Sequence, residues 1–362
     1  MRDDIADWLT LLKCPGLGPV AMGHLLARFT TPGAVLRASF SDLIQTESLG
    51  PEAARAVRKA DMQWAEDQLL ACDSHSVDIL TLADEAYPEQ LKNTFAPPPV
   101  LYVKGDISAA TLPCVAIVGA RKSTSYGRHI ARMFGEELAR RGVCVVSGLA
   151  LGIDACAHQG ALRGGATIAV MGTGLDHPYP LTNLAVFNEI CEKGAVISEF
   201  PMGTRADPKH FPRRNQTISG ISLGVLVVEA GPESGSLLTA QFAIDQNRDV
   251  FAIPGPVTSS NSLGPHDLIR EGAVLAQSPD SILQELGLLS DQSVRPHPQQ
   301  VPALSGIEGE IVACLSSSGT SHVDTIATSV GRPSGEVLTI LLGLELSSLV
   351  SQLPGKQFAL KH

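Results

Sequence analysis

The sequence has few of the features that mark secreted, membrane-spanning or metal-binding chains. Its seven cysteines are odd in number, widely scattered and never spaced as Cys-x-x-Cys, which disfavours both a disulfide framework and a zinc site. No apolar run approaches the length that spans a bilayer, and Asp3 and Asp4 make the N-terminus too acidic for a secretory leader. We therefore expect a cytoplasmic protein with reduced thiols, no metal or other cofactor and no membrane contact.

Positive charge is also scarce. The chain has 27 Lys and Arg against 37 Asp and Glu, for a net charge of −10, which argues against a surface that coats nucleic acid on all sides. Two segments reverse this balance: residues 119–142 hold six Lys and Arg against two Glu, and residues 203–214 hold four against one Asp. A polyanion would therefore bind locally, at these two basic segments.

The length of 362 residues favours more than one domain. Composition and periodicity predict a helical module at 1–80, a larger α/β domain at 81–286, a flexible linker rich in Ser, Gln and Pro at 287–304, and a small domain at 305–362.

The first module contains one informative turn, from Pro15 to Pro19. Its glycines resemble the hairpin of helix-hairpin-helix modules, in which exposed amides approach a DNA phosphate. The same residues could simply turn a tight corner between two helices, and the excess of acidic residues in 1–80 favours that reading.

In the central domain, short β-branched runs alternate with helical segments, which is typical of a mostly parallel sheet. Each expected strand ends at glycine or a small polar residue, where a doubly wound sheet places its ligand loops. The fold class is therefore α/β, with strands expected at 115–118, 143–146, 167–170, 195–198, 225–228 and 250–253.

The first of these loops runs from Gly119 through Ala120 and Arg121 to Thr124. Amides at a helix start, the Arg121 guanidinium and the hydroxyls of Ser123 and Thr124 could form a phosphate-sized anion site. The alternative is an N-cap beside a surface arginine. Neither a Gly-x-Gly-x-x-Gly fingerprint nor a P-loop accompanies the motif.

The second loop, Ser147-Gly148-Leu149-Ala150, precedes Asp154 and His158, which lie four residues apart on one helical face. They could form an acid–base pair, but no nucleophile or metal-ligand cluster accompanies them. A glycine-rich turn in which both residues tie neighbouring loops together is the favoured reading.

Two further segments suit an extended polyanion. Phe211, Arg213, Arg214 and Asn215 combine a ring with guanidinium groups, a combination that suits single-stranded nucleic acid, although Phe211 could instead be core. Gly235 and Ser236 would add another helix start to the same sheet edge.

Residues 305–362 show three helical segments and a hairpin, the order of a winged helix. The third helical segment, 333–346, carries Glu336 and Glu345 but no Lys or Arg, which disfavours readout of duplex DNA and a role as a duplex-binding regulator. A protein contact or self-association fits this module better.

Together these motifs resemble the DNA-processing protein A family (DprA/Smf). The resemblance is strong over residues 95–285 and weaker at both ends, and it also includes Gly172 to Asp176, Tyr179-Pro180 with Asn183, and Phe251 to Gly255. It implies an extended Rossmann-like sheet, flanked by a SAM-like or helix-hairpin-helix module and a winged helix. It also implies a homodimer that binds and protects single-stranded DNA in natural transformation, loads the RecA recombinase and displaces single-strand-binding protein.

By motif position, the resemblance implies that Arg121 grips a phosphate, that Phe211 stacks or packs near a base, and that Lys209 and Arg214 line the groove. Two positions depart from the family pattern: Gln216 replaces an expected arginine, for which Arg213 could compensate, and Leu181 stands where many relatives have lysine.

We predict a binding protein without catalytic chemistry. The rival is a phosphoribohydrolase acting on nucleoside monophosphates, but Glu233 to Ser236 replace the Pro-Gly-Gly-x-Gly-Thr loop of those enzymes. No catalytic or metal-ligating residue is expected, and the candidate DNA-binding residues are Gly119, Ala120, Arg121, Ser123, Thr124, Ser147, Gly148, Leu149, Lys209, Phe211, Arg213, Arg214, Asn215, Gly235 and Ser236.

Overall fold

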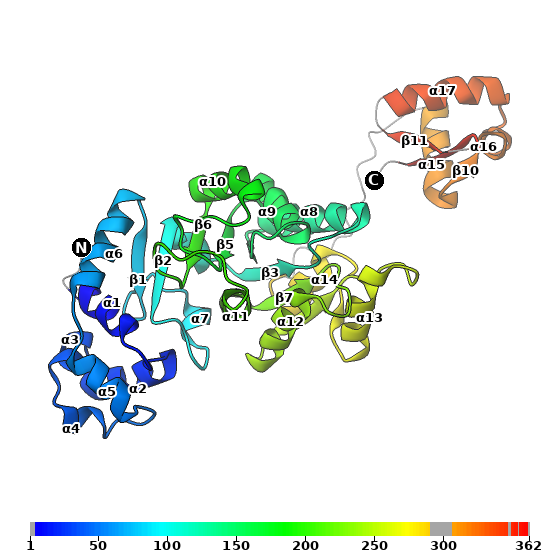
Figure 1. The fold of residues 1–362 in the computed structure, drawn as a ribbon. Helices are drawn as coiled ribbons and strands as arrows, with labels where there is room; N and C mark the ends of the chain where they lie inside the picture. The colour runs from blue at the N-terminus through cyan, green and yellow to red at the C-terminus, as the bar shows by residue number, and fades with distance from the viewer. Residues whose placement is uncertain (1–3, 290–305, 347–348, 354, 361–362) are drawn as a thin grey trace. The chain divides into compact units, whose positions relative to one another are not determined.

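The computed structural model describes residues 4–289, 306–346, 349–353 and 355–360 (Figure 1). The chain divides into two compact units, residues 1–289 and 290–362. From residue 290 onward, the linker expected at 287–304 lies outside the described residues.

The first unit begins with short helices. Gly16, at a φ of +77°, makes the turn between the first two, in the left-handed region that glycine adopts without strain. The expected helical module is therefore present, with a tight corner at the Pro15–Pro19 turn. Its helices are α1 (Ile5–Lys13), α2 (Pro19–Phe29), α3 (Pro32–Arg37), α4 (Phe40–Leu43), α5 (Pro51–Arg58) and α6 (Gln63–Ser74).

A nine-stranded sheet follows, in the order β1-β2-β6-β5-β4-β3-β7-β8-β9. The strands from β6 to β9 run parallel, whereas β2 pairs antiparallel with both β1 and β6. The strands are β1 (Asp78–Thr81), β2 (Val100–Gly105), β3 (Cys114–Val118), β4 (Cys144–Ser147), β5 (Thr167–Met171), β6 (Ala195–Ser198), β7 (Gly224–Val227), β8 (Asp249–Ala252) and β9 (Val274–Leu275).

The six strands expected from the sequence are all present, with ends within one residue of the predicted ones. Every residue of β3 to β7 is buried, because helices cover both faces of the sheet (Figure 1). One face packs on α8 (Ser125–Arg140), α9 (Ile153–Gly164) and α14 (Pro279–Glu285). The α/β class with a mostly parallel sheet is confirmed.

The other face packs on helices that follow β6, β7 and β8, together with one short helix before β2. These are α11 (His210–Ile221), α12 (Gly235–Asp245), α13 (Leu263–Arg270) and α7 (Glu89–Lys92). α10 (Leu184–Lys193) packs beside β5 and β6, and three single 3₁₀ turns complete the unit: η1 (Ile107–Thr111), η2 (Leu181–Asn183) and η3 (Ser260–Ser262).

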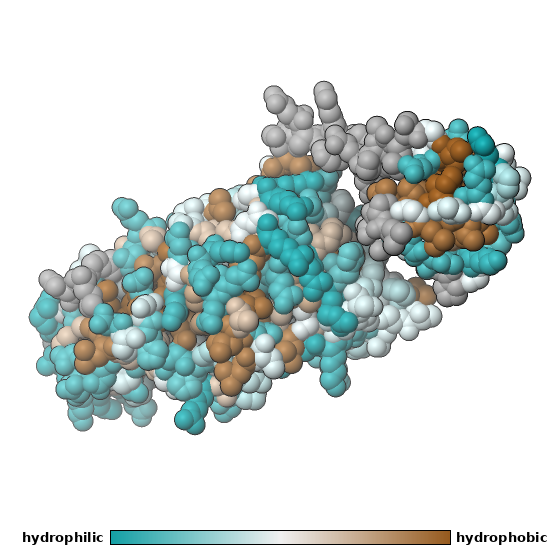
Figure 2. All heavy atoms as spheres, turned by 90° about the horizontal axis from the view of Figure 1, so that it is seen from above, coloured by the Kyte–Doolittle hydropathy of each residue, from teal (hydrophilic) through white to brown (hydrophobic). Residues whose placement is uncertain are grey.

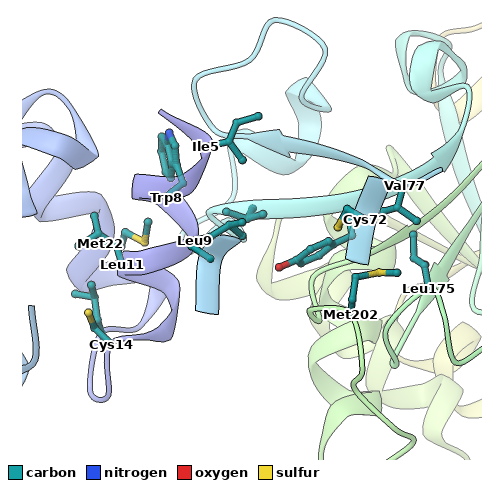
Figure 3. Close-up of a cluster of buried hydrophobic side chains, with 14 of the residues drawn as sticks. Ile5, Trp8, Leu9, Leu11, Cys14, Met22, Cys72, Val77, Leu175 and Met202 are labelled. Carbon is teal, nitrogen blue, oxygen red and sulfur yellow. The ribbon is translucent and has the colours of Figure 1, made fainter. Parts of the chain in front are cut away.

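The N-terminal helices share a hydrophobic core with the sheet. Leu9 and Cys72 belong to the same buried cluster as Leu175 and Met202, which come from loops after β5 and β6 (Figure 3). The boundary expected at residue 80 also falls inside β1, which pairs with β2. The helical module therefore packs directly against the sheet.

The second unit is a winged helix, as expected. Its helices are α15 (Ile307–Ser318), α16 (Val323–Val330) and α17 (Ser334–Leu346), and its small sheet has the order β10-β12-β11, from Ser321–His322, Gln357–Leu360 and Val350–Leu353. Ile311, Ile326, Leu341 and Phe358 are fully buried at its centre.

Hydrophilic residues cover much of the face of the molecule seen in Figure 2, with smaller hydrophobic areas between them. Among the described residues, no helix combines the length and the apolar character that a membrane crossing requires.

Candidate nucleic-acid interface

A groove of about 810 Å³ lies at the carboxyl ends of β3, β4 and β7. Most of the residues that line it come from the loops after these three strands, from α11 and from the start of α12. Because α8 follows β3 on one face of the sheet and α12 follows β7 on the other, the loops diverge between these neighbouring strands. This is the position at which open α/β sheets bind their ligands.

Two guanidinium groups flank one aromatic ring in this groove. The Cζ atom of Arg121 lies 5.4 Å from the centroid of the Phe211 ring, and that of Arg214 lies 5.7 Å from it. Both contacts fall within the range of cation–π attraction. Arg121 is exposed and Phe211 is half-buried, so the Arg121 guanidinium is free to meet an anion from solvent.

Arg214 is buried, with only 5% of its surface exposed, and its Nη1 donates to the carbonyl of Val170 at 3.2 Å. Burial lowers the pKa of Arg214, and the carboxylate of Asp154 opposes that shift. The neighbouring residue Gly148 is essential to this arrangement, because a Cβ atom there would lie 1.4 Å from Arg214 Nη1. Arg214 therefore acts as a fixed internal cation beneath the groove.

Asp154 is the counter-charge in this cluster. Its carboxylate accepts hydrogen bonds from the amides of Gly148 at 3.2 Å and Ala150 at 3.4 Å. Burial raises the pKa of Asp154, whereas Arg214 and these amides lower it. Asp154 therefore ties the loop after β4 to the floor of the groove, and no hydrogen bond joins it to His158 in the described structure.

His158 is fully buried, and its side chain contacts a different segment of the chain from the one that Asp154 holds. Its Nδ1 lies 2.7 Å from the hydroxyl of Thr167, which itself donates to the carbonyl of Val145 at 2.6 Å, so the ring nitrogen is the donor. Asp154 thus ties the loop after β4, as the favoured reading of the motif predicted, whereas His158 contacts strand β5 and not a loop. Burial lowers the pKa of His158 from 6.5 to about 3.

We expect this histidine to make the fold sensitive to acid. Below pH 6.5 the unfolded chain takes up a proton at this residue, whereas the folded protein does so only near pH 3, so stability falls as the pH drops through that window. Between pH 7 and pH 5 the loss should be about 2 kcal/mol. Urea unfolding at the two pH values measures it.

His158→Gln should remove this pH dependence, because the amide can still donate to Thr167 but does not titrate. The exposed His129 offers the control, since His129→Gln should leave the dependence unchanged. An identical pH dependence in His158→Gln and the original protein would contradict the assignment.

The start of α8 differs from the expected anion site. The amide and hydroxyl of Thr124 both donate to the carboxylate of Glu229, which is buried after β7, and the amide of Ala120 donates to the Glu229 carbonyl at 2.7 Å. The anion that meets the Thr124 donors is therefore the protein's own side chain, and the Ala120 amide bonds to a main-chain carbonyl. Direct DNA contact by Thr124 and Ala120 stays a prediction. Ser123 is only partly exposed, whereas Arg121 and Lys122 reach the groove.

The second loop also supports the groove from within. The Ser147 hydroxyl is fully buried and donates to the carbonyl of Ile117 at 2.6 Å, and Leu149 is 1% exposed. The amide of Gly148 is bonded to Asp154. Ser147, Gly148 and Leu149 therefore position the loop, and their assignment as direct DNA contacts stays a prediction.

Lys209 and Arg213 do not line the groove. Lys209 is exposed at the start of α11, one residue after Pro208, which does line it. Arg213 instead pairs with the buried Glu199 and borders a separate cavity of about 290 Å³, together with Gln216. Arg213 therefore supplies no charge to the groove, and the departure at Gln216 lies outside it as well.

The start of α12 faces the groove, as expected. Gly235 is exposed, Ser236 is buried, and the Asn215 side chain donates to the Gly235 carbonyl at 3.2 Å. Three basic residues line the groove, Arg121, Lys122 and Arg214, and so do two acidic residues, Asp154 and Glu233. With Asp154 buried beside Arg214, the accessible cations are Arg121 and Lys122.

Several lining residues were not among the candidates, and Lys122 and Asn261 are two of them. Lys122 follows Arg121 in the first basic segment, and that position could have indicated it. Asn261 in η3 donates to the Lys122 carbonyl at 3.0 Å, and nothing in its local sequence signals this role. Within the described residues, no group of three potential ligands could hold a metal ion.

Comparison with known proteins supports one family. A family model described as DNA recombination-mediator protein A matches residues 78–287, and a model of the DprA winged helix domain matches residues 295–356. Protein Smf of Escherichia coli is 37% identical over 371 residues, which cover 99% of this chain and 96% of that protein. The DNA processing protein DprA of Streptococcus pneumoniae is 40% identical over 221 residues, covering 61% and 78%.

Solved structures agree with this. The X-ray structure of DprA from Streptococcus pneumoniae matches with a TM-score of 0.69 and 32% identity, covering 79% of this chain and 99% of that one. A Helicobacter pylori DprA structure, described for its single-stranded DNA binding mode, matches with a TM-score of 0.52 and 30% identity, covering 58% and 95%. With family models matched at residues 78–287 and 295–356 and with Protein Smf aligned over 99% of this chain, the chain belongs to the DNA recombination-mediator protein A (DprA/Smf) family.

Proposed function

We propose that the chain binds single-stranded DNA in the groove between the β3 and β7 loops. The observation that carries this proposal is the exposed Arg121 guanidinium over the half-buried Phe211 ring. A guanidinium can hold a phosphate in bidentate fashion while the ring and neighbouring planar groups contact a base. Binding of this kind is electrostatic and largely independent of sequence.

The relatives support the same ligand. The Helicobacter pylori protein is described by its binding of single-stranded DNA, and this chain shares its fold over 95% of that protein's length. Lys209, two residues before Phe211 on α11, is exposed and offers a further cation beside the groove.

The wider role follows from family membership. We infer that the protein acts in natural transformation, where it protects incoming single strands, loads a RecA-type recombinase and displaces single-strand-binding protein. We further infer that it works in the cytoplasm as a homodimer and catalyses no reaction. The winged helix would make a protein contact, because its third helix, α17, carries Glu336 and Glu345 and no basic residue.

Titration with labelled single and double strands of equal length tests the ligand. We expect tighter binding of the single strand, with log K falling linearly with log salt at about −0.7 per neutralised phosphate. Fluorescence anisotropy at several salt concentrations gives both values.

The same purified protein can be used to distinguish the proposed function from the alternative functions. A preference for duplex would support a duplex-binding regulator and contradict the proposal. Release of free base from nucleoside monophosphates would instead support the phosphoribohydrolase.

A further inference from the structure

The groove continues past Phe211 toward a second aromatic ring. Arg121, Ala150, Phe211 and Arg214 line the main groove and also a narrow cavity of about 40 Å³, whose remaining wall includes Tyr179. We propose that Tyr179 is a second base-stacking platform, which takes the nucleobase next to the one held at Arg121 and Phe211. This inference rests on the proposed binding of single-stranded DNA.

The rings of Phe211 and Tyr179 differ in how much of each is exposed to solvent. Phe211 is half-buried and has the guanidinium groups of Arg121 and Arg214 over it. Tyr179 is 46% exposed, and in the described part of the chain no cation lies over its ring. The ring centroids are 6.0 Å apart with an interplanar angle of 37°. Tyr179 is therefore the ring with an open face for a base.

The narrow cavity determines where that base would lie. A volume of about 40 Å³ holds a few water molecules at most, so a nucleobase does not fit between the two side chains. The base must lie against the solvent-exposed side of Tyr179. Successive bases of one strand would then contact the arginine-flanked ring and the free ring in turn.

The segment that carries Tyr179 is anchored to the groove. The side-chain amide of Asn183 donates to the carbonyls of Leu149 at 2.8 Å and Ala150 at 3.3 Å, in the loop after β4. The platform is therefore attached to the same loop that Asp154 holds from below. Because this segment is already held in place, less conformational entropy is lost when a base stacks on the Tyr179 ring.

The surroundings of Tyr179 favour a base over a phosphate. Leu151 also lines the narrow cavity and is 44% exposed, while Leu181 and Leu184 on the same anchored segment are 70% and 40% exposed. Apolar side chains can contact the face of a base, but they form no hydrogen bond or ion pair with a phosphate. Affinity gained at this end of the site should therefore be nearly independent of salt.

Substitution of Tyr179 in the full-length protein tests the inference. With labelled oligothymidine, Tyr179→Ala should raise Kd about 5- to 100-fold and leave the slope of log K against log salt unchanged. Tyr179→Phe should bind like the original protein, because stacking needs the ring and not the hydroxyl. Phe95→Ala provides the control, since Phe95 is 90% exposed and lines neither cavity.

A fluorescence measurement covers the case in which the alanine variant folds poorly. Tyr179→Trp places a reporter at the platform, and saturating oligothymidine should quench its emission relative to the original protein, whose two tryptophans, Trp8 and Trp64, both lie in the N-terminal helices. Tight binding by Tyr179→Ala, or unquenched emission from Trp at 179 with DNA bound, would overturn the inference and leave the proposed function standing. Failure of the original protein to bind single strands would overturn the proposed function itself.

Discussion

Arg121→Ala is expected to weaken binding of single-stranded DNA by about 10- to 100-fold at low salt, because a charge-assisted hydrogen bond to phosphate contributes about 1.5–3 kcal/mol. This loss should exceed that of any substitution in residues 306–362. Arg121 is the exposed guanidinium that lines both the main groove and the narrow cavity, and the alanine removes its contact with phosphate as well as the cation over Phe211.

The salt dependence identifies the cause of this loss. Removal of one phosphate contact should reduce the slope of log K against log salt by about 0.7. Arg270→Ala is the matched control, because Arg270 has 75% of its side chain exposed on α13 and lies outside the groove. A variant that binds as tightly as the original protein, with an unchanged slope, would show that Arg121 does not meet a phosphate.

Asp154→Ala is expected to cost about 3–5 kcal/mol of folding free energy, because it leaves a buried guanidinium without its counter-charge. Asp154 and Arg214 are 6% and 5% exposed, and the change also deprives the amides of Gly148 and Ala150 of their acceptor. Arg214 is held in place, because its Nη1 occupies the space that a Cβ atom at residue 148 would fill and donates to the carbonyl of Val170. Chemical denaturation measures the loss.

A double variant isolates the role of the charge. Asp154→Ala combined with Arg214→Met removes both ionic groups and should recover much of the lost stability, since a buried pair can often be replaced by apolar side chains. Asp267→Ala is the control, because Asp267 is exposed on α13 and pairs with Arg270 at the surface. Equal destabilisation by the single and double variants would contradict the electrostatic account.

Much of the fold could be predicted from the sequence because its signals are local. Buried β-branched runs such as Val115–Val118 end at glycine, and this pattern identified six parallel strands and the edge at which their loops gather. The family resemblance further implied that Arg121, Phe211 and Arg214 share one site, and the structure places both guanidinium groups over the Phe211 ring. The two-residue β9 left no comparable signal.

The accessibility of donors could not be predicted in this way, because it depends on long-range contacts. Glu229 lies 105 residues from Thr124, yet its carboxylate fills the start of α8 where a phosphate was expected. Arg213 and Arg214 are adjacent in sequence, but a helix turns about 100° per residue, so one reaches Glu199 and the other the floor of the groove.

The sequence by itself therefore determined the strands, the edge of the sheet at which their loops lie, and the basic residues in those loops. Hydrophobic periodicity and strand-ending glycines are signals that extend over only a few residues. Only the tertiary structure decided which of those residues remain accessible. It buried Ser147 and Arg214, engaged Thr124 with Glu229 and left the rings of Phe211 and Tyr179 side by side. The physical reason is that burial and hydrogen-bond partners are set by packing between distant segments.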